Sequence, residues 1–429
     1  MPKRWSASSL LAHSSRSSGA TRWPRPRHAS RHSLRPHSPP IRTACGCVPP
    51  LIRCRPFFPV TVEVTVRHRA QRILDAASVP LDAVVLMNGR MPFSDSTFRY
   101  VSGVTRGGYE NCAAVLLPGE KPALVVSDLE RESALTAPDS EIHAYASQAA
   151  QRGILTTLLG DARRIGVHGQ GIVKARADEL AETFPEAEIV DVTAAVNAAR
   201  LVKDAEEIAL IRAACALTSD VAARIPSMLR EGMTEVDLSS AIAAAIREGG
   251  GKNAFDTIAC FGANGSEPHY SPGDVPLRPG DMILTDFGAE LAGYCSDITR
   301  MFVFGTASPE QRAMFDVVRS AQKTGLELTT SGVEAREVHR RVREEIDAPE
   351  FAGKFIHGTG HSIGLDVHDG GGLNDASEIV LEPGMVMTVE PGVYVPGVGG
   401  VRIEDTVVVT EGGPDILTPV TKDLVETGA

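Results

Sequence analysis

Two runs of strand-forming residues flank a glycine in the stretch Met282-Ile-Leu-Thr-Asp286-Phe-Gly-Ala-Glu-Leu-Ala-Gly-Tyr-Cys-Ser-Asp297-Ile-Thr-Arg300. This pattern predicts an antiparallel hairpin that closes near residue 291 or 292. With that turn, Asp286 and Asp297 face each other, and directly opposed Cβ atoms in a hairpin are about 4.5–5.5 Å apart. Two ionised carboxylates at such a distance repel each other unless a cation lies between them. The pair therefore predicts a binuclear metal site, whose ions lie about 3.5–4 Å apart.

The stretch 385–404 repeats this arrangement, because two more strand-like runs surround a turn rich in proline and glycine. The midpoint between Glu390 and Glu404 is Gly397, so these glutamates also face each other if a hairpin forms. Pro391 cannot donate a ladder hydrogen bond, and the strand is expected to end or bulge beside it. The second hairpin thus supplies a second pair of carboxylates.

Three histidines within twelve residues, His357, His361 and His368, lie between the hairpins and are interleaved with glycines. One neutral imidazole added to four carboxylates gives an oxygen-dominated site, which favours Mn²⁺ or Co²⁺ over a thiolate-rich zinc site. Taken alone, an acid pair on a hairpin is usually solvated, and a histidine in a glycine-rich loop is usually structural. Together these features favour metal binding, because burying four carboxylates without cations costs several kcal/mol per charge.

These segments resemble the pita-bread metallopeptidases, the family of methionine aminopeptidase, aminopeptidase P and prolidase, over roughly residues 204–410. The order Asp, Asp, His, Glu, Glu is specific to that family. The resemblance implies two divalent metal ions, with Mn²⁺ expected first and Co²⁺ or Zn²⁺ as alternatives. The metal ligands that it implies are Asp286, Asp297, His361, Glu390 and Glu404.

The resemblance also implies catalytic and substrate-binding residues. Glu390 is placed to take a proton from the attacking water and pass it to the leaving nitrogen. His269 and His368 are expected to hydrogen-bond the tetrahedral oxyanion or the substrate backbone, and they count with Glu390 as catalytic. His357 and Arg402 complete the expected substrate-binding set, and Arg402 also braces the acidic cluster.

Alternating helix and strand patterns predict two folded domains. A small α/β domain is expected over 67–192, where the segment 98–103 is interpreted as a turn between strands. The resemblance implies that this domain is creatinase-like and that residues 193–429 form a pita-bread catalytic domain with an antiparallel sheet, an α+β fold. Residues 1–66 lack any period and are interpreted as a disordered extension or as sequence upstream of the true start.

The composition of the chain argues against some classes of binding partner. Residues 1–60 carry eleven Lys and Arg and no acidic residue, so the rest of the chain holds all 54 acidic side chains and only 32 basic ones. Such an acidic body argues against a nucleic-acid partner. The longest apolar stretches have strand length, so no membrane partner is expected. The seven cysteines show no CxxC spacing, which is typical of reduced thiols in a cytoplasmic protein.

The expected function is that of an Xaa-Pro dipeptidase that attacks the bond before proline with a metal-bridging hydroxide. The short connection between Glu390 and Glu404 resembles bacterial prolidases, but the arginine that prolidases often carry after His368 is missing. An aminopeptidase P acting on longer Xaa-Pro peptides is therefore the alternative, and a non-catalytic peptide-binding paralogue is less favoured because such relatives lose ligands. The expected partners are short proline-containing peptides and a second copy of the chain in a homodimer.

Overall fold

The computed structural model describes residues 66–347 and 349–428. The predicted N-terminal extension thus lies outside the described residues, apart from Val66, which begins the first helix, α1 (Val66–Asp75). None of the described helices combines the length and the apolar character needed to cross a membrane.

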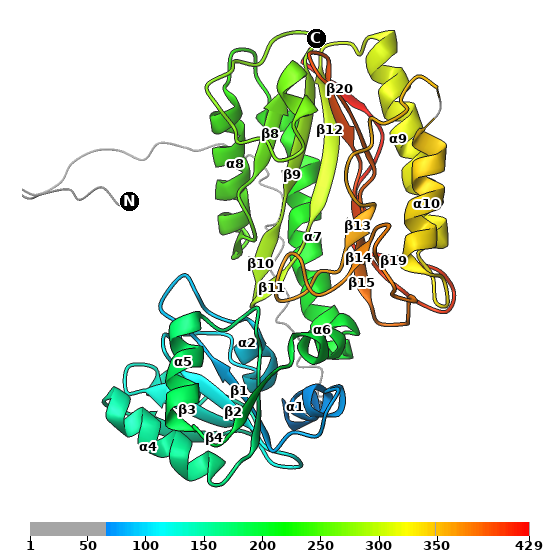
Figure 1. Ribbon diagram of the computed structural model, residues 1–429. Coiled ribbons are helices and arrows are strands. Elements are labelled where there is room, and N and C mark those ends of the chain that lie inside the picture. The colour runs from blue at the N-terminus through cyan, green and yellow to red at the C-terminus, as the bar shows by residue number, and fades with distance from the viewer. Residues whose placement is uncertain (1–65, 348, 429) are drawn as a thin grey trace, which may run out of the picture. The chain divides into compact units, whose positions relative to one another are not determined.

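A six-stranded mixed sheet forms the centre of the N-terminal part of the fold (Figure 1). Its strand order is β4-β3-β2-β1-β5-β6, in which β1, β2 and β3 are antiparallel neighbours and the remaining pairs are parallel. The strands are β1 (Ala83–Met87), β2 (Ala113–Leu116), β3 (Ala123–Ser127), β4 (Glu141–Tyr145), β5 (Arg164–Val167) and β6 (Glu188–Asp191).

Helices cover both faces of this sheet. Val84 and Leu86 of β1 pack in a cluster with α1, α2 (Thr97–Ser102) and α6 (Thr193–Leu201). The alternate residues Ala83, Val85 and Met87 pack in a second cluster with α4 (Gln148–Leu159) and α5 (Lys174–Thr183). Successive strand residues point to opposite faces, so a strand buried on both faces becomes a continuous apolar run. The α/β fold predicted for this region is confirmed; a four-residue helix, α3 (Arg131–Ala134), completes it.

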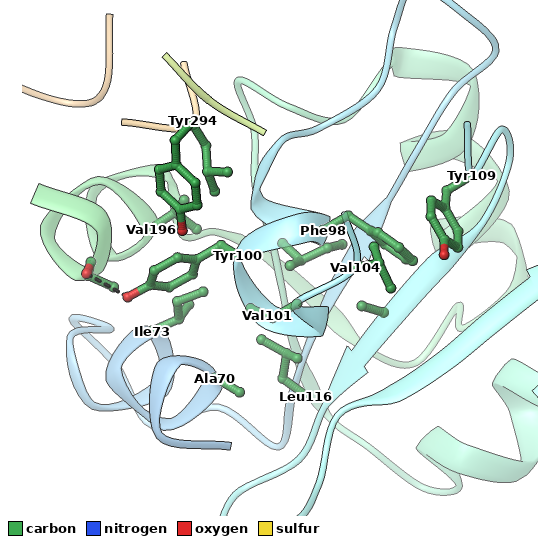
Figure 2. Close-up of a cluster of buried hydrophobic side chains, with 14 of the residues drawn as sticks. Ala70, Ile73, Phe98, Tyr100, Val101, Val104, Tyr109, Leu116, Val196 and Tyr294 are labelled. Atoms are coloured by element: carbon green, nitrogen blue, oxygen red, sulfur yellow. Dashed lines mark hydrogen bonds between the residues drawn. The ribbon is translucent and has the colours of Figure 1, made fainter. Parts of the chain in front are cut away.

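The turn predicted at 98–103 is wrong, because the segment forms the helix α2. The Asp95 carboxylate accepts a hydrogen bond from the backbone N–H of Thr97, 2.8 Å away, at the start of the helix. Phe98 and Val101, one helical turn apart, are both buried (Figure 2). Gly103 ends the helix in the left-handed conformation. Tertiary packing therefore stabilises a helix too short to form alone.

The C-terminal part is built on the antiparallel strands β8 (Ile258–Phe261), β9 (Met282–Phe287) and β12 (Ile298–Phe304), with β20 (Val425–Thr427) parallel to β12. One face packs against α7 (Ala205–Met228) and α8 (Glu235–Glu248), and the other against α9 (Pro309–Leu328) and α10 (Ala335–Ile346) (Figure 1). Capping boxes begin α7, α8 and α9, and the box of α8 joins Thr234 and Asp237. The predicted antiparallel sheet is also confirmed.

Short strands carry the loops around the site. They are β7 (Lys252–Asn253), β10 (Ala289–Leu291), β11 (Tyr294–Cys295), β13 (Gly360–His361), β14 (Gly372–Leu373), β15 (Val386–Val389), β16 (Gly392–Val395), β17 (Gly399–Arg402), β18 (Asp405–Val408) and β19 (Asp415–Ile416), with the 3₁₀ helix η1 (Gly262–Ser266). Tyr294 of β11 is buried in the same cluster as Ile73, Tyr100 and Val196, and Figure 2 shows these side chains together.

Candidate metal centre

The turn of the first acid-bearing hairpin is centred one residue later than predicted. Leu291 pairs with Tyr294, so the turn consists of Ala292 and Gly293, both with positive φ. Asp286 therefore pairs with Thr299, and Asp297 lies two residues away in the gap between β11 and β12. The predicted direct opposition of Asp286 and Asp297 is wrong. Because side chains alternate with period two, the two aspartates still belong to the same face.

The second hairpin follows the prediction. Val389 of β15 pairs with Asp405 of β18, and Gly392 of β16 pairs with Arg402 of β17. Both ladders have the same register, which places Glu390 opposite Glu404 in the gap between them. The strand stops at Val389, directly before Glu390 and Pro391, as the missing proline N–H predicts.

A close backbone approach brings His361 to these acids. A Cβ on Gly360 would lie 1.9 Å from the carbonyl oxygen of Thr388, so only glycine allows β13 to run this close to β15. The His361 backbone N–H donates to Thr388 Oγ1 at 2.9 Å. Its ring Nδ1 lies 3.3 Å from the Ser362 carbonyl oxygen. His361 Nε2 is left facing Glu390 Oε1 at 3.4 Å and Asp297 Oδ2 at 3.6 Å.

The donor atoms fit a metal ion. Asp297, His361 and Glu404 each offer one ligand atom, and these atoms lie within 4.8 Å of one another. Asp286 Oδ1, Asp297 Oδ1 and Glu404 Oε1 are buried and have no hydrogen-bond partner among the described residues. Buried carboxylate oxygens are normally hydrogen-bonded. Asp297 and Glu404, which group with the His361 imidazole, and Asp286, which lines the cavity beside them, offer a donor set suited to hard divalent cations.

The same crowding changes the acidity of the carboxyl groups. Burial first, and then the neighbouring acids, raises the pKa of Asp297 and of Glu404 well above the ordinary range. Burial also raises the pKa of Glu390 to about 7, although the Arg402 guanidinium opposes the rise. Burial lowers the pKa of His361. Cations would relieve the repulsion that raises the carboxyl pKa values.

Hydroxyl and guanidinium groups brace the acids from behind. Arg402 donates to Asp286 Oδ2, and Thr299 donates to Glu404 Oε2 at 2.7 Å. Thr388 donates to Glu390 Oε1 at 3.1 Å. Sequence reasoning missed both threonines, yet Thr299 and Thr388 each stand two residues from a predicted ligand. In an extended strand, residues two apart point to the same face, so this spacing was the signal in the sequence that could have identified the two threonines as neighbours of the ligands.

The predicted site residues gather around a cavity of about 560 Å³. Four of the predicted ligands line the cavity, whereas Glu404 is buried and is not among its lining residues. All four predicted substrate-contacting residues line it as well. The lining residues from the predicted set are Asp286, Asp297, His361, Glu390, His269, His357, His368 and Arg402.

The histidines of the cavity differ in their freedom to bind. His357 Nδ1 lies 2.8 Å from the Gly358 carbonyl oxygen and Nε2 lies 2.8 Å from the Tyr394 hydroxyl, so both ring nitrogens are occupied. Burial lowers the pKa of His357 to about 4. The exposed His368 ring packs on His361, with 4.2 Å between ring centroids. His368 and His269 make no side-chain hydrogen bond to the described residues, so both can donate into the cavity.

Comparison with known proteins assigns both parts of the chain. The family model of metallopeptidase family M24 matches residues 209–411, and the model of the creatinase/prolidase N-terminal domain matches residues 67–202. The Xaa-Pro dipeptidase of Pyrococcus furiosus is 31% identical over 76% of this chain and 92% of its own length.

Solved structures agree with the sequence matches. The Xaa-Pro dipeptidase from Bacillus anthracis is 28% identical, with a TM-score of 0.77 over 84% of this chain and 99% of that one. The X-Pro aminopeptidase from Thermotoga maritima is 27% identical, with a TM-score of 0.76 over 83% of this chain and 99% of that one. The architecture is therefore a creatinase-type N-terminal domain followed by a pita-bread domain.

Proposed function

Because the chain belongs to metallopeptidase family M24, we propose that it hydrolyses the peptide bond before proline, with two divalent metal ions held by the acid cluster. The ligands are Asp286, Asp297, His361, Glu390 and Glu404. The observation that carries this proposal is the set of three orphaned, buried carboxylate oxygens beside one cavity, two of them on residues that group with an imidazole. When bound, the ions would supply Lewis acidity and a water of lowered pKa as the source of hydroxide.

Glu390 is the proposed proton carrier. Its side chain lines the cavity beside the other predicted ligands. A carboxylate within reach of the attacking water can accept its proton and return that proton to the leaving group. Thr388 holds Oε1, which leaves Oε2 to exchange the proton between the attacking water and the leaving nitrogen.

The histidines of the cavity divide the remaining work. His269 and His368 donate to the oxyanion or to the substrate backbone, since neither side chain is hydrogen-bonded to the described residues. His357 contributes the shape of its ring, because both of its nitrogens are already bonded. A prolyl nitrogen carries no N–H in the scissile amide, so selection for proline depends on ring shape.

A second activity, on longer Xaa-Pro peptides, is favoured by the charge of the cavity wall. Within 66–347 and 349–428, Arg402 is the one Lys or Arg that lines the cavity. Its guanidinium already donates to Asp286, Tyr394 and Thr299. The carboxylate of a dipeptide thus finds no free cation there, and a buried carboxylate gains most from a charged donor. Dipeptides should therefore be preferred over tripeptides only moderately.

Kinetics on three peptides test the function. Chelation should abolish activity, and Mn²⁺ or Co²⁺ should restore it. kcat/KM should be highest for Ala-Pro, about tenfold lower for Ala-Pro-Ala, a difference of about 1.4 kcal/mol, and far lower for Ala-Ala. Full activity without metal would refute the metal site. Equal rates on Ala-Ala would refute proline selection, and faster cleavage of Ala-Pro-Ala would make the protein an aminopeptidase P.

Mn²⁺ as the native ion, a homodimer and a cytoplasmic location stay predictions. Metal analysis of the protein purified without added metal checks the first. Light scattering of the purified protein checks the second, and fractionation of the source cells checks the third.

A further inference from the structure

A lysine with no part in the proposed chemistry lies beside the metal centre. Lys203, between α6 and α7, has a side chain that is 0% exposed. Its Nζ donates to Ser362 Oγ at 2.7 Å and to the Leu201 carbonyl oxygen at 3.3 Å. It lies 3.8 Å from Asp369 Oδ2. Removing an ammonium group from water is costly, so its partners must compensate for that cost.

Two of these partners, Ser362 and Asp369, lie at the two ends of one loop. The loop 362–369 begins directly after His361 and contains His368. The Ser362 carbonyl oxygen accepts from the Asp369 backbone N–H at 2.8 Å, which closes the loop. Lys203 reaches the Ser362 hydroxyl at one end and the Asp369 carboxylate at the other, so it spans this closure.

The loop folds tightly around the ammonium group. A Cβ on Gly364, inside the loop, would lie 3.1 Å from Lys203 Cε and 2.1 Å from Asp369 Oδ2. Arg200 also pairs with Asp369, at 2.7 Å. Arg200, near the end of α6, and Lys203, just after α6, therefore both hold the Asp369 carboxylate of the loop.

The same carbonyl that closes the loop orients the candidate ligand. Ser362 O lies 3.3 Å from His361 Nδ1, which leaves Nε2 directed at the acids. Hydrogen bonds of this kind fix the tautomer and the ring orientation of a metal-binding histidine. His368 packs on the His361 ring, so a movement of the loop displaces both rings.

We propose that Lys203 is a positioning residue, which clamps the loop 362–369 and thereby orients the imidazoles of His361 and His368. The clamp serves the reaction through the proposed function, in which these two histidines bind metal and substrate. A lysine that merely stabilised the junction between the domains would leave the two imidazoles unchanged when substituted.

The test substitution is Lys203→Met, which keeps an unbranched chain of similar length and removes the charge and the hydrogen bonds. Ser362→Ala is a second, milder test substitution. It removes the hydroxyl that accepts from Lys203 and keeps the backbone carbonyl that faces His361. Lys174→Met is the matched control, because Lys174 is 86% exposed and pairs with Asp178 on the surface.

The primary measurement is imidazole ¹⁵N NMR of the metal-free protein. The wild type and the Lys174→Met control should show His361 as a single Nδ1-protonated tautomer. Lys203→Met should mix the tautomers of His361 and shift His368, and Ser362→Ala should do the same to a smaller extent. If Lys203→Met does not fold, the alanine variant carries the test alone.

Metal binding provides the second measurement. Co²⁺ affinity should fall about tenfold in Lys203→Met, as for other partners behind a ligand. The Co²⁺ absorption bands should shift as well. In the Lys203→Met/Ser362→Ala double variant, the loss of Co²⁺ binding free energy should be smaller than the sum of the losses in the two single variants. Wild-type imidazole signals in both variants would overturn the proposal. Absence of metal binding by the wild type would refute the proposed function instead, and the NMR comparison would still decide the role of Lys203.

Discussion

The two acid-bearing hairpins close in different ways. The first closes through two left-handed residues, Ala292 and Gly293, and its ladder is interrupted beside Gly288. The second closes through a longer loop around Gly397, and in both hairpins the strand pairs keep one register on the two sides of the gap in the ladder. The first hairpin thus has the more tightly constrained turn, and each ladder opens where an acid reaches the cavity, at Asp297 in the first hairpin and at Glu390 in the second.

The acids of the two hairpins are also held differently. Asp286 of the first hairpin is bound by Arg402 of the second, and Glu404 of the second is bound by Thr299 of the first. Each hairpin therefore supplies the brace for an acid of the other. Asp297 and Glu390 both line the cavity, and Asp286, Asp297 and Glu404 each keep an orphaned buried oxygen. Both hairpins should therefore bind metal, and under the proposed function the second adds proton transfer through Glu390.

The largest expected effect separates these two roles. Glu390→Gln should lower kcat about 10³-fold, because proton transfer by a positioned group contributes about 10²–10⁴-fold. KM for Ala-Pro should change by less than about threefold, since the amide keeps the shape of the cavity. Steady-state kinetics at saturating Mn²⁺ provide the measurement. Glu382→Gln, the same substitution at an exposed residue, is the control.

Asp297→Asn in the first hairpin completes this comparison. It should weaken metal binding, so that a higher Mn²⁺ concentration recovers part of its activity, whereas Glu390→Gln should not recover. An unchanged kcat in the glutamine variant would show that Glu390 is not the proton carrier.

The next effect concerns stability. In Gly288→Ala, the new Cβ would lie 2.0 Å from the Ser296 carbonyl oxygen, a backbone atom that cannot move away easily. The free energy of unfolding should fall by about 3 kcal/mol or more. In Gly397→Ala, nothing lies within 4 Å of the new Cβ, and the cost is that of its positive φ, about 1 kcal/mol. Urea unfolding measures both, and equal losses would contradict the proposed difference between the hairpins.

For a residue in a hairpin, the sequence predicts the face of the sheet on which its side chain lies more reliably than the residue that pairs with it. Moving the turn of the first hairpin by one residue position changed the partner of Asp286 by two residues but left Asp297 on the same face. The helix α2 was missed because its stability comes from packing around Phe98, and a six-residue segment carries no helical period. Acids inside apolar runs were visible in the sequence, whereas the interlocking braces depend on strand pairs formed far apart in the chain.

A smaller effect should appear in the pH dependence of stability. Burial raises the pKa of Glu390 to about 7 in the metal-free protein, while the unfolded chain has an ordinary glutamate. A carboxyl group with a raised folded pKa favours folding when protonated, and this contribution is lost as the pH rises from about 4.5 to about 7. Histidines with a lowered pKa, such as His357, act in the opposite direction over the same range, so the effect of Glu390 is a difference between variants. The Tm of the metal-free wild type should fall by about 3 °C or more across that range relative to the Tm of Glu390→Gln.

Mn²⁺ should remove this slope, because a bound cation stabilises the ionised carboxylate. Thermal melts in EDTA and in Mn²⁺ make the comparison. The same change of Tm with pH in the wild type and in Glu390→Gln, both in EDTA, would contradict the raised pKa of Glu390. The exposed Glu382→Gln variant should melt like the wild type, whereas Glu390→Gln should lose part of the slope.

The smallest effect tests the turn of the first hairpin itself. Ala292 adopts a φ of 52°, a left-handed conformation in which a Cβ costs about 1–2 kcal/mol. Ala292→Gly removes that cost but adds about 0.5–1 kcal/mol of backbone entropy that folding must overcome. The two contributions nearly cancel, so the free energy of unfolding should rise by about 0.5 kcal/mol. Urea unfolding of the variant beside Ala289→Gly, which lies in β10 and should lose stability, measures the difference. A loss of 1 kcal/mol or more in Ala292→Gly would show that this turn is not strained, and that Gly288 alone sets the tightness of the first hairpin.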